Sequence, residues 1–206
     1  MNISEFDRQA DVLELVKASR NKYEWRPKSR IWVKSEYPQA NTLYAKNAIF
    51  ASHGVVARSV KITTRMQSDL TMHNALQLKP PDGDHCFIVD INVDIPGFMV
   101  ITAALVTPVL CRAERTTTGT GTLNRPETIK HRSISFPGVL TEKYLRQTQE
   151  EPMSVSEARY LLVTPKAINI SVGELVHIGG LNYETVIKHD LDEYKNEYEI
   201  LRRSDN

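Results

Sequence analysis

The side chains best able to do chemistry are six histidines, two cysteines and several carboxylates, so their spacing is considered first. The histidines are His53, His73, His85, His131, His177 and His189. None of them forms His-Glu-x-x-His or another metal-ligand spacing on a shared element. His85 stands between Asp84 and Cys86, but neighbouring residues of a strand point to opposite faces, so a Cys/His pair is not expected. We therefore expect no metal and no cofactor.

The carboxylates and glycines lack a catalytic pattern too. Asp90, Asp94 and Asp192 lie at expected strand ends, where turn and edge roles are typical. Gly119-Thr120-Gly121 is not followed by the Gly-Lys-Ser/Thr of a phosphate loop, and no Gly-x-Ser-x-Gly elbow occurs. The sequence thus predicts that the protein is not an enzyme, and a hydrolase of unrecognised type is the least favoured alternative.

Composition narrows the class of protein further. Cys86 and Cys111 sit among apolar residues, and we interpret both as buried free thiols made in a reducing cytoplasm. The net charge of +1 predicts neither nucleic acid nor membrane binding. No apolar run approaches the roughly 18 residues that span a bilayer. Residues 1–8 lack the basic and apolar regions of a secretory signal, so none is expected.

Four short strands with similar breaks occur twice in the chain. The first copy holds 60–65, 75–78, 86–91 and 98–102, and the second holds 159–164, 173–178, 183–188 and 197–201. Turn residues such as Pro80-Pro81-Asp82-Gly83 and Gly179-Gly180 separate the strands. Short strands divided by such breaks indicate one small β module built twice.

The stretch before the first copy is expected to complete its module. Residues 12–16 fit either a helix or a strand, and we favour a strand, because Asn21-Lys22 then makes a turn into an alternating strand over 23–35. A short helix or connector is expected within 40–52. The predicted fold class is therefore all-β: two tandem small antiparallel β-barrel or sandwich modules with minor helices and a long exposed loop.

The predicted module boundaries are 1–108 and 109–206, and the long loop is placed at 116–132. This segment holds only Leu123 and Ile129 as large apolar residues, so it buries little surface and we expect an exposed loop or hairpin tip. Residues 112–132 carry four arginines and one lysine against two glutamates, which makes the region mildly basic. A merely solvated loop and an element reaching toward DNA or a partner are both left open.

A second basic stretch carries aromatic residues as well. Its members are Arg20, Lys22, Arg26, Lys28, Arg30 and Lys34, interleaved with Tyr23, Trp25 and Trp32. Such a string is typical of a single-strand platform on a β barrel. A strand pair that alternates core residues with solvated charge produces the same string, and we favour that interpretation.

The chain resembles the head-tail joining proteins (head closure, or stopper, proteins) of tailed bacteriophages. In the first half the resemblance lies in the strands Arg30–Lys34 and Val60–Arg65 and in the Gly-marked hairpin Gly83–Asp90. The second half is similar to phage neck proteins in the hairpin Gly173–Ile187 and in the long-loop layout of 112–164. Two tandem modules depart from the single module that is usual in that family.

The resemblance implies a structural virion protein of the neck, made in the host cytoplasm. Such a protein forms a homo-oligomeric ring, a hexamer or dodecamer, that continues the portal channel for double-stranded DNA. The ring helps retain packaged DNA and binds portal or adaptor proteins and tail proteins. The resemblance implies no membrane. We expect channel or partner contacts from Arg115, Arg125, Lys130 and Arg132. Exposed strand edges at 60–65 and 159–164 are expected to add to a neighbour's sheet. The alternative is a nucleic-acid-binding β-barrel module.

Overall fold

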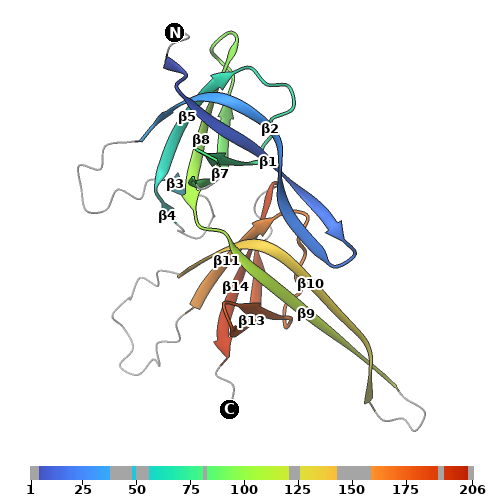
Figure 1. The fold of residues 1–206 in the computed structure, drawn as a ribbon. Helices are drawn as coiled ribbons and strands as arrows, with labels where there is room; N and C mark the ends of the chain where they lie inside the picture. Colours follow the sequence, from blue (N-terminus) through green and yellow to red (C-terminus); the bar gives the residue numbers. More distant parts are fainter. Residues whose placement is uncertain are drawn as a thin grey trace, which may run out of the picture. The chain divides into compact units, whose positions relative to one another are not determined.

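The structure is a computed structural model, and it describes residues 5–37, 48–49, 56–80, 83–120, 126–142, 159–189 and 193–203. The described residues are almost entirely β strand, which confirms the all-β prediction. They form two compact units (Figure 1). Unit 1 contains residues 1–16 and 25–108, and unit 2 contains residues 17–24 and 109–206.

Unit 1 is a closed barrel. Its strands are β1 (Arg8–Ser19), β2 (Lys22–Glu36), β5 (Ser59–Arg65), β6 (Ala75–Leu78), β7 (His85–Asn92) and β8 (Phe98–Val106). They pair in the order β1-β6-β7-β8-β5-β2, and β2 pairs back with β1, which closes a ring of six strands. A separate antiparallel ladder joins β3 (Ala48–Ile49) to β4 (Val56–Ala57).

Unit 2 repeats this barrel. Its strands are β9 (Val109–Thr120), β10 (Pro126–Glu142), β11 (Arg159–Pro165), β12 (Leu175–Ile178), β13 (Leu181–His189) and β14 (Lys195–Arg203). The order β9-β12-β13-β14-β11-β10, with β10 paired back to β9, matches that of unit 1 strand for strand. The repeated strands of the sequence correspond to β5–β8 and β11–β14, and both sets hold the same places in their barrels.

The two barrels also share their irregularities. A β-bulge interrupts the β7–β8 ladder between Ile88 and Asp90, and another interrupts the β13–β14 ladder between Thr185 and Ile187. Bulges bend a strand and increase its twist, which is how a sheet this small curves onto itself. Because the ladders agree in register as well as in order, residues of the matching ladders have identifiable counterparts in the two barrels.

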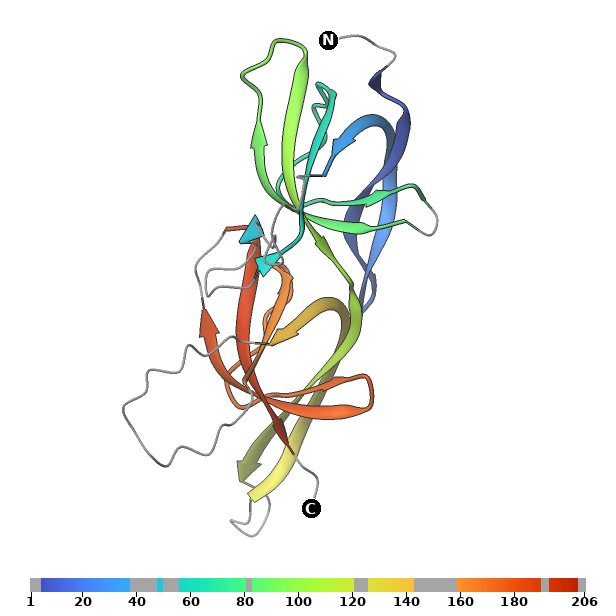
Figure 2. The same cartoon turned by 90° about the vertical axis from the view of Figure 1, so that its left-hand side faces the viewer.

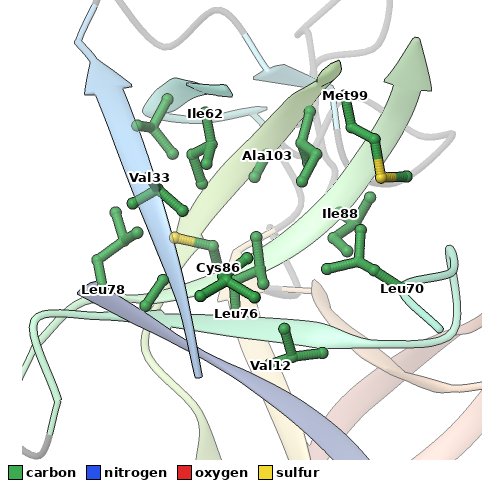
Figure 3. Packing of buried hydrophobic residues seen from close by; sticks show 14 residues of the cluster. Val12, Val33, Ile62, Leu70, Leu76, Leu78, Cys86, Ile88, Met99 and Ala103 are labelled. Carbon is green, nitrogen blue, oxygen red and sulfur yellow. The ribbon is translucent and has the colours of Figure 1, made fainter. Parts of the chain in front are cut away.

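Strand alternation accounts for the interior of each barrel. Along β2, Ile31 and Val33 are buried while their neighbours Arg30 and Trp32 are exposed, as expected when successive side chains point to opposite faces. In unit 1 the inward side chains from six strands converge on one another, as Figure 3 shows for Val12, Val33, Ile62, Leu76 and Ile88. Each such side chain contributes about 1.5–3 kcal/mol by leaving water.

The interior of unit 2 is built in the same way and includes aromatic residues. Its fully buried side chains include Phe136, Leu162, Ile168, Ile170, Val176, Tyr198 and Ile200. Cys86 and Cys111 are buried free thiols, as expected from the sequence. Burial raises the pKa of both thiols to about 12.

The segment 116–132, expected as a long exposed loop or a hairpin tip, is a hairpin in its described residues and not a long loop. Residues 116–120 and 126–132 belong to β9 and β10, whose ladder continues as far as Thr120↔Pro126 with one bulge between Thr128 and Lys130. Figure 2 shows this hairpin running on past its own barrel. Threonine-rich runs favour extended backbone, and the ladder satisfies the backbone hydrogen bonds of the two strands. Residues 121–125 lie outside the described residues.

The predicted free edges at 60–65 and 159–164 were also wrong. β5 pairs with β2 on one side and β8 on the other, and β11 pairs with β10 and β14. Ring closure gives every barrel strand two neighbours, so these strands cannot extend another sheet.

The expectations for the first 52 residues had mixed outcomes. The strand favoured for 12–16 is confirmed as part of β1, and the turn into β2 is at Arg20-Asn21. Within the segment 40–52, where a helix or connector was expected, Ala48–Ile49 is strand β3 and the remainder lies outside the described residues.

Candidate functional site

Arg115 is the one predicted contact residue whose side chain the structure describes. It lies on β9, is about half exposed, and its Nε is 3.5 Å from Oε1 of Glu174. Glu174 is in the turn before β12, where its Oε2 accepts a hydrogen bond of 3.1 Å from the amide of Ser171. The turn needs Gly173, whose φ of +84° is a left-handed conformation that glycine adopts without strain. Arg115 is therefore partly engaged in holding this turn.

The corresponding turn of unit 1 shows what the Arg115–Glu174 pair replaces. There Asn74 takes the place of Glu174, and its Oδ1 accepts a 2.8 Å bond from the amide of Thr71. The Asn74 amide donates to the carbonyl of Leu13 at 3.2 Å. Unit 1 thus links this turn to β1 through a neutral hydrogen bond, whereas unit 2 links it to β9 through an ion pair. The ion pair leaves the Arg115 guanidinium half exposed at the surface.

Nearby side chains on β9 and β12 reduce the positive charge of this surface. Glu114 lies 2.8 Å from Nη2 of Arg112 through one carboxylate oxygen and 3.5 Å from Nε2 of His177 through the other. His177 projects from the face opposite to Val176 and Ile178, in line with the alternating burial along β12. The outer side of the barrel is therefore less basic than the number of its arginines suggests.

The register of the β9–β10 hairpin places the other predicted contact residues. Arg132 is the ladder partner of Arg115, and Lys130 is the partner of Thr117. Arg125 lies outside the described residues. The structure thus brings Arg115, Lys130 and Arg132 onto one two-stranded ribbon, within a few residues of each other on its two strands.

Beside Arg115, unit 2 holds the turn formed by residues 17–24. The carbonyl of Asn21 accepts a 2.8 Å hydrogen bond from the amide of Ser135, and Lys22 pairs with Ser135 in parallel. A polar pocket of about 200 Å³ lies here. Its lining includes Tyr23, Ala113, Arg115, Ile134, Ala167 and Glu174. We missed this docked turn from the sequence because the contacting segments are more than a hundred residues apart.

Unit 1 carries a larger and more apolar groove of about 470 Å³. It is lined by Phe6, Ser29, Arg30, Ile31, Trp32, Thr64, Arg65 and Gln67. Trp32 is 56% exposed, which is high for a side chain as large and apolar as tryptophan. Phe6 is held by stacking on Phe98 with ring centroids 5.8 Å apart. The alternation along β2 placed Trp32 on the outer face, so its exposure was predictable, but the groove around it was not.

Arg30, which lines this groove, has a fixed position. Its Nε and Nη2 donate to the two carboxylate oxygens of Asp11 at 2.6 and 3.1 Å. Hydrogen bonding to Asp11 raises the pKa of the Arg30 guanidinium, with the Asp11 charge acting in the same direction. A bidentate pair of this kind holds the side chain in one orientation.

Three other cations of the basic and aromatic stretch are paired with acids. Lys22 lies 2.8 Å from Glu24, Lys28 lies 3.7 Å from Asp69, and Lys34 lies within 3.0 Å of both Glu5 and Glu36. The hydrogen bonds that Lys34 donates to Glu5 and Glu36 raise the pKa of its ammonium group. These pairs support the interpretation of the stretch as a strand with solvated charge, because a phosphate would have to compete with carboxylates already in place.

One buried polar cluster was not anticipated from the sequence. Glu197 and Glu199 alternate along β14 with the core residues Tyr198 and Ile200, yet both carboxylates are buried. Oε1 of Glu199 lies 2.9 Å from Nε2 of His189. The described residues contain no group of three His, Cys, Asp or Glu side chains placed to hold a metal ion. Among the same residues, no helix is long and apolar enough to cross a membrane.

Comparisons of the chain with protein-family models, with curated proteins and with solved structures found no match. The geometry of the chain itself therefore carries the functional argument. It defines a β protein made of two six-stranded barrels of one topology. The features that remain to be assigned are a basic ribbon, a docked turn and an apolar groove.

Proposed function

We propose that the protein is a structural component of a bacteriophage neck. In this role it forms a homo-oligomeric ring that continues the portal channel, helps retain packaged double-stranded DNA and docks the tail. The observation that carries the proposal is the β9–β10 ribbon, which extends past a closed barrel and brings together Arg115, Lys130 and Arg132.

The pairing of this ribbon supports a role in contacts with other molecules. β12 pairs with β9 only from Cys111 to Glu114. β11 pairs with β10 only from Val139 to Glu142, and the turn at Lys22 meets β10 at Ser135. Among the described residues, the outer edges of the ribbon beyond these points therefore have no strand beside them. Such edges offer main-chain donors and acceptors to a neighbouring chain.

The charge of the ribbon suits a DNA channel better than a sequence-specific site. Cations that meet phosphates position DNA without reading its bases. A few cations per copy, repeated around a ring, attract DNA without holding it in one register. The Arg115–Glu174 pair weakens the attraction further, and DNA that must later leave the head benefits from weak contacts.

Electron microscopy of assembled particles tests the proposal directly. We expect density for two small barrels per copy in the neck, between the portal and the tail. Particles whose neck lacks the protein would rule the proposal out.

Charge reversal tests the role of the ribbon. We expect the triple variant Arg115→Glu, Lys130→Glu and Arg132→Glu to lose packaged DNA or to attach fewer tails, measured as the fraction of full, tailed particles. The matched control reverses Lys188, Arg202 and Arg203, which are exposed residues elsewhere in unit 2. Equal yields of full, tailed particles for the two triple variants would show that the charges of the ribbon are not needed for DNA retention or tail attachment.

A further inference from the structure

The turn docked in unit 2 has a counterpart that is not docked within the described residues. The turn joins β1 to β2, and the corresponding hairpin of the second barrel is β9–β10. Strands β9 and β10 have 12 and 17 residues, against 12 and 15 for β1 and β2, so the second hairpin is the longer one.

The surface that receives the docked turn has a counterpart too. Lys34 pairs with Thr63, and Val139 pairs with Val163 at the same place in the second barrel. Counting back along β2 and β10 makes Arg30 the counterpart of Ser135. In the same way Ser29 is the counterpart of Ile134.

The segment after β5 extends this correspondence. The amide of Met66 donates to the carbonyl of Gly97, and the amide of Lys166 donates to the carbonyl of Tyr194 at the matching position. Gln67 is thus the counterpart of Ala167. Of the residues around the docked turn, Ile134, Ser135 and Ala167 therefore correspond to Ser29, Arg30 and Gln67.

Those three counterparts all line the groove of unit 1. The surface that unit 2 uses to hold the turn at Asn21–Tyr23 is therefore the surface that unit 1 presents as an apolar groove with a half-exposed Trp32. Among the residues that the structure describes, the same barrel face is occupied in one repeat and open in the other.

We propose that the groove of unit 1 receives the end of the β9–β10 hairpin from a second copy of this chain. The contact is heterologous, because the hairpin and the groove are different surfaces of each copy. A repeated heterologous contact generates a ring when the rotation closes and a filament when it does not. The inference deepens the proposed neck function and rests on it for its biological setting, since it names the interface that would join the copies of the ring.

The main chain and the charges of the two surfaces are compatible with this docking. β5 pairs with β2 only from Val33 to Glu36, so the groove lies beside the part of β2 that precedes this ladder. The first residues of β10 would pair there as Lys22 pairs with Ser135. They include the acidic Glu127, and the groove carries the exposed Arg65 as well as Arg30, which is already paired with Asp11. Burial of Trp32 would supply apolar area at the centre of the contact, where tryptophan is often an anchor.

A complementation experiment tests the interface. The groove variant is Trp32→Asp, and the hairpin variant replaces residues 118–129 by Asn-Gly, a turn that fits a two-residue β-hairpin loop. In light scattering across a concentration series, we expect the unmodified chain to self-associate and each variant alone to associate at least about tenfold more weakly. An equimolar mixture is expected to form dimers, because one variant retains the hairpin and the other retains the groove.

A matched control and a cross-link complete the test. Val93→Asp changes another exposed apolar residue of unit 1 that does not line the groove, and it should associate like the unmodified chain. A chain with Gln67→Cys and Thr128→Cys should form a disulfide between copies, while the buried Cys86 and Cys111 stay unreacted. Circular dichroism and the unfolding midpoint check that each variant is folded.

Several results would overturn the inference. The first is a mixture of the two variants that stays monomeric. The second is a Trp32→Asp chain that associates as well as the unmodified one. The third is an unmodified chain that is monomeric but binds a single-stranded oligonucleotide through Trp32. The outcomes for the proposed function are separate. Mixed dimers with no protein in the neck would reject the neck function alone, whereas protein in the neck without mixed dimers would reject the groove contact alone.

Discussion

At matching positions of the last barrel strand, unit 1 has Met99 and Ile101 where unit 2 has Asn196 and Tyr198. Asn196 Nδ2 donates to the carbonyls of Lys166 and Ile168 at 3.0 and 2.7 Å. The Tyr198 hydroxyl donates to the carbonyl of Ile168 at 2.9 Å and accepts from the amide of Ile170 at 3.1 Å.

The difference shows that one barrel backbone accepts two kinds of interior. Unit 1 fills this part of the barrel interior with apolar side chains. There Met99 Sδ accepts a hydrogen bond of 3.2 Å from the amide of Gln67. Unit 2 uses buried polar groups, whose hydrogen bonds go to the main chain of the segment after β11. Such groups are tolerated only because each is bonded, since an unpaired buried polar atom is costly.

The outer faces differ as well. Lys61 of β5 is exposed, whereas its counterpart on β11, Leu161, is fully buried. Leu162 and Val163 are buried too, so β11 is buried on both faces, while β5 keeps Lys61 and Arg65 exposed on either side of the buried Thr63. Equal topology therefore does not imply equal surroundings, and the two repeats have diverged in what they bury and what they present.

The largest expected effect comes from matched truncations in the two cores. Ile62→Ala and Leu162→Ala remove fully buried side chains at counterpart positions, and each should cost about 2–5 kcal/mol of unfolding free energy. If the units unfold separately, each variant lowers only one transition in calorimetry. A single transition that both variants lower equally would instead show that the two barrels unfold together.

A smaller effect is expected at Gly138, the counterpart of Val33. A Cβ on Gly138 would lie 2.9 Å from Cδ1 of Leu162 and 3.1 Å from Sγ of Cys111, so Gly138→Val should cost about 1–3 kcal/mol by overpacking. In unit 1, Val33 is combined with Ala10, the counterpart of Cys111. Adding Cys111→Ala should therefore recover part of the loss in urea unfolding, and no recovery would show that the two barrels distribute volume differently.

The smallest effect in the series concerns the polar interior of unit 2. Tyr198→Phe removes one hydroxyl that makes two buried hydrogen bonds, and we expect a loss of about 1–2 kcal/mol because the amide of Ile170 loses its partner. Tyr183→Phe, at a buried tyrosine that packs edge-to-face on Tyr160, is the control and should cost less. Equal losses in thermal unfolding would mean that the hydroxyl of Tyr198 does not stabilise the segment.

Part of the candidate site followed from local sequence and part did not. Arg115, Lys130 and Arg132 are close in the chain, so their gathering on one element was predictable, and a hairpin was one of the two expected forms. Glu174, which neutralises Arg115, was missed because it lies in another strand connection. The docking surface at Ser135 was missed for the same reason: it depends on a turn from the other end of the chain.

The sequence by itself determined the all-β class, the repeated strands and the face of each strand that is buried. These are local properties: alternation with a period of two selects the inner residues, and glycine and proline mark the turns. Only the tertiary structure decided that each set of strands closes into a ring, which pairs β1 with β6 and β9 with β12 and removes the expected free edges. It also decided which cations are neutralised and which barrel face is open. Such outcomes depend on contacts between residues far apart in the chain, and no local pattern specifies them.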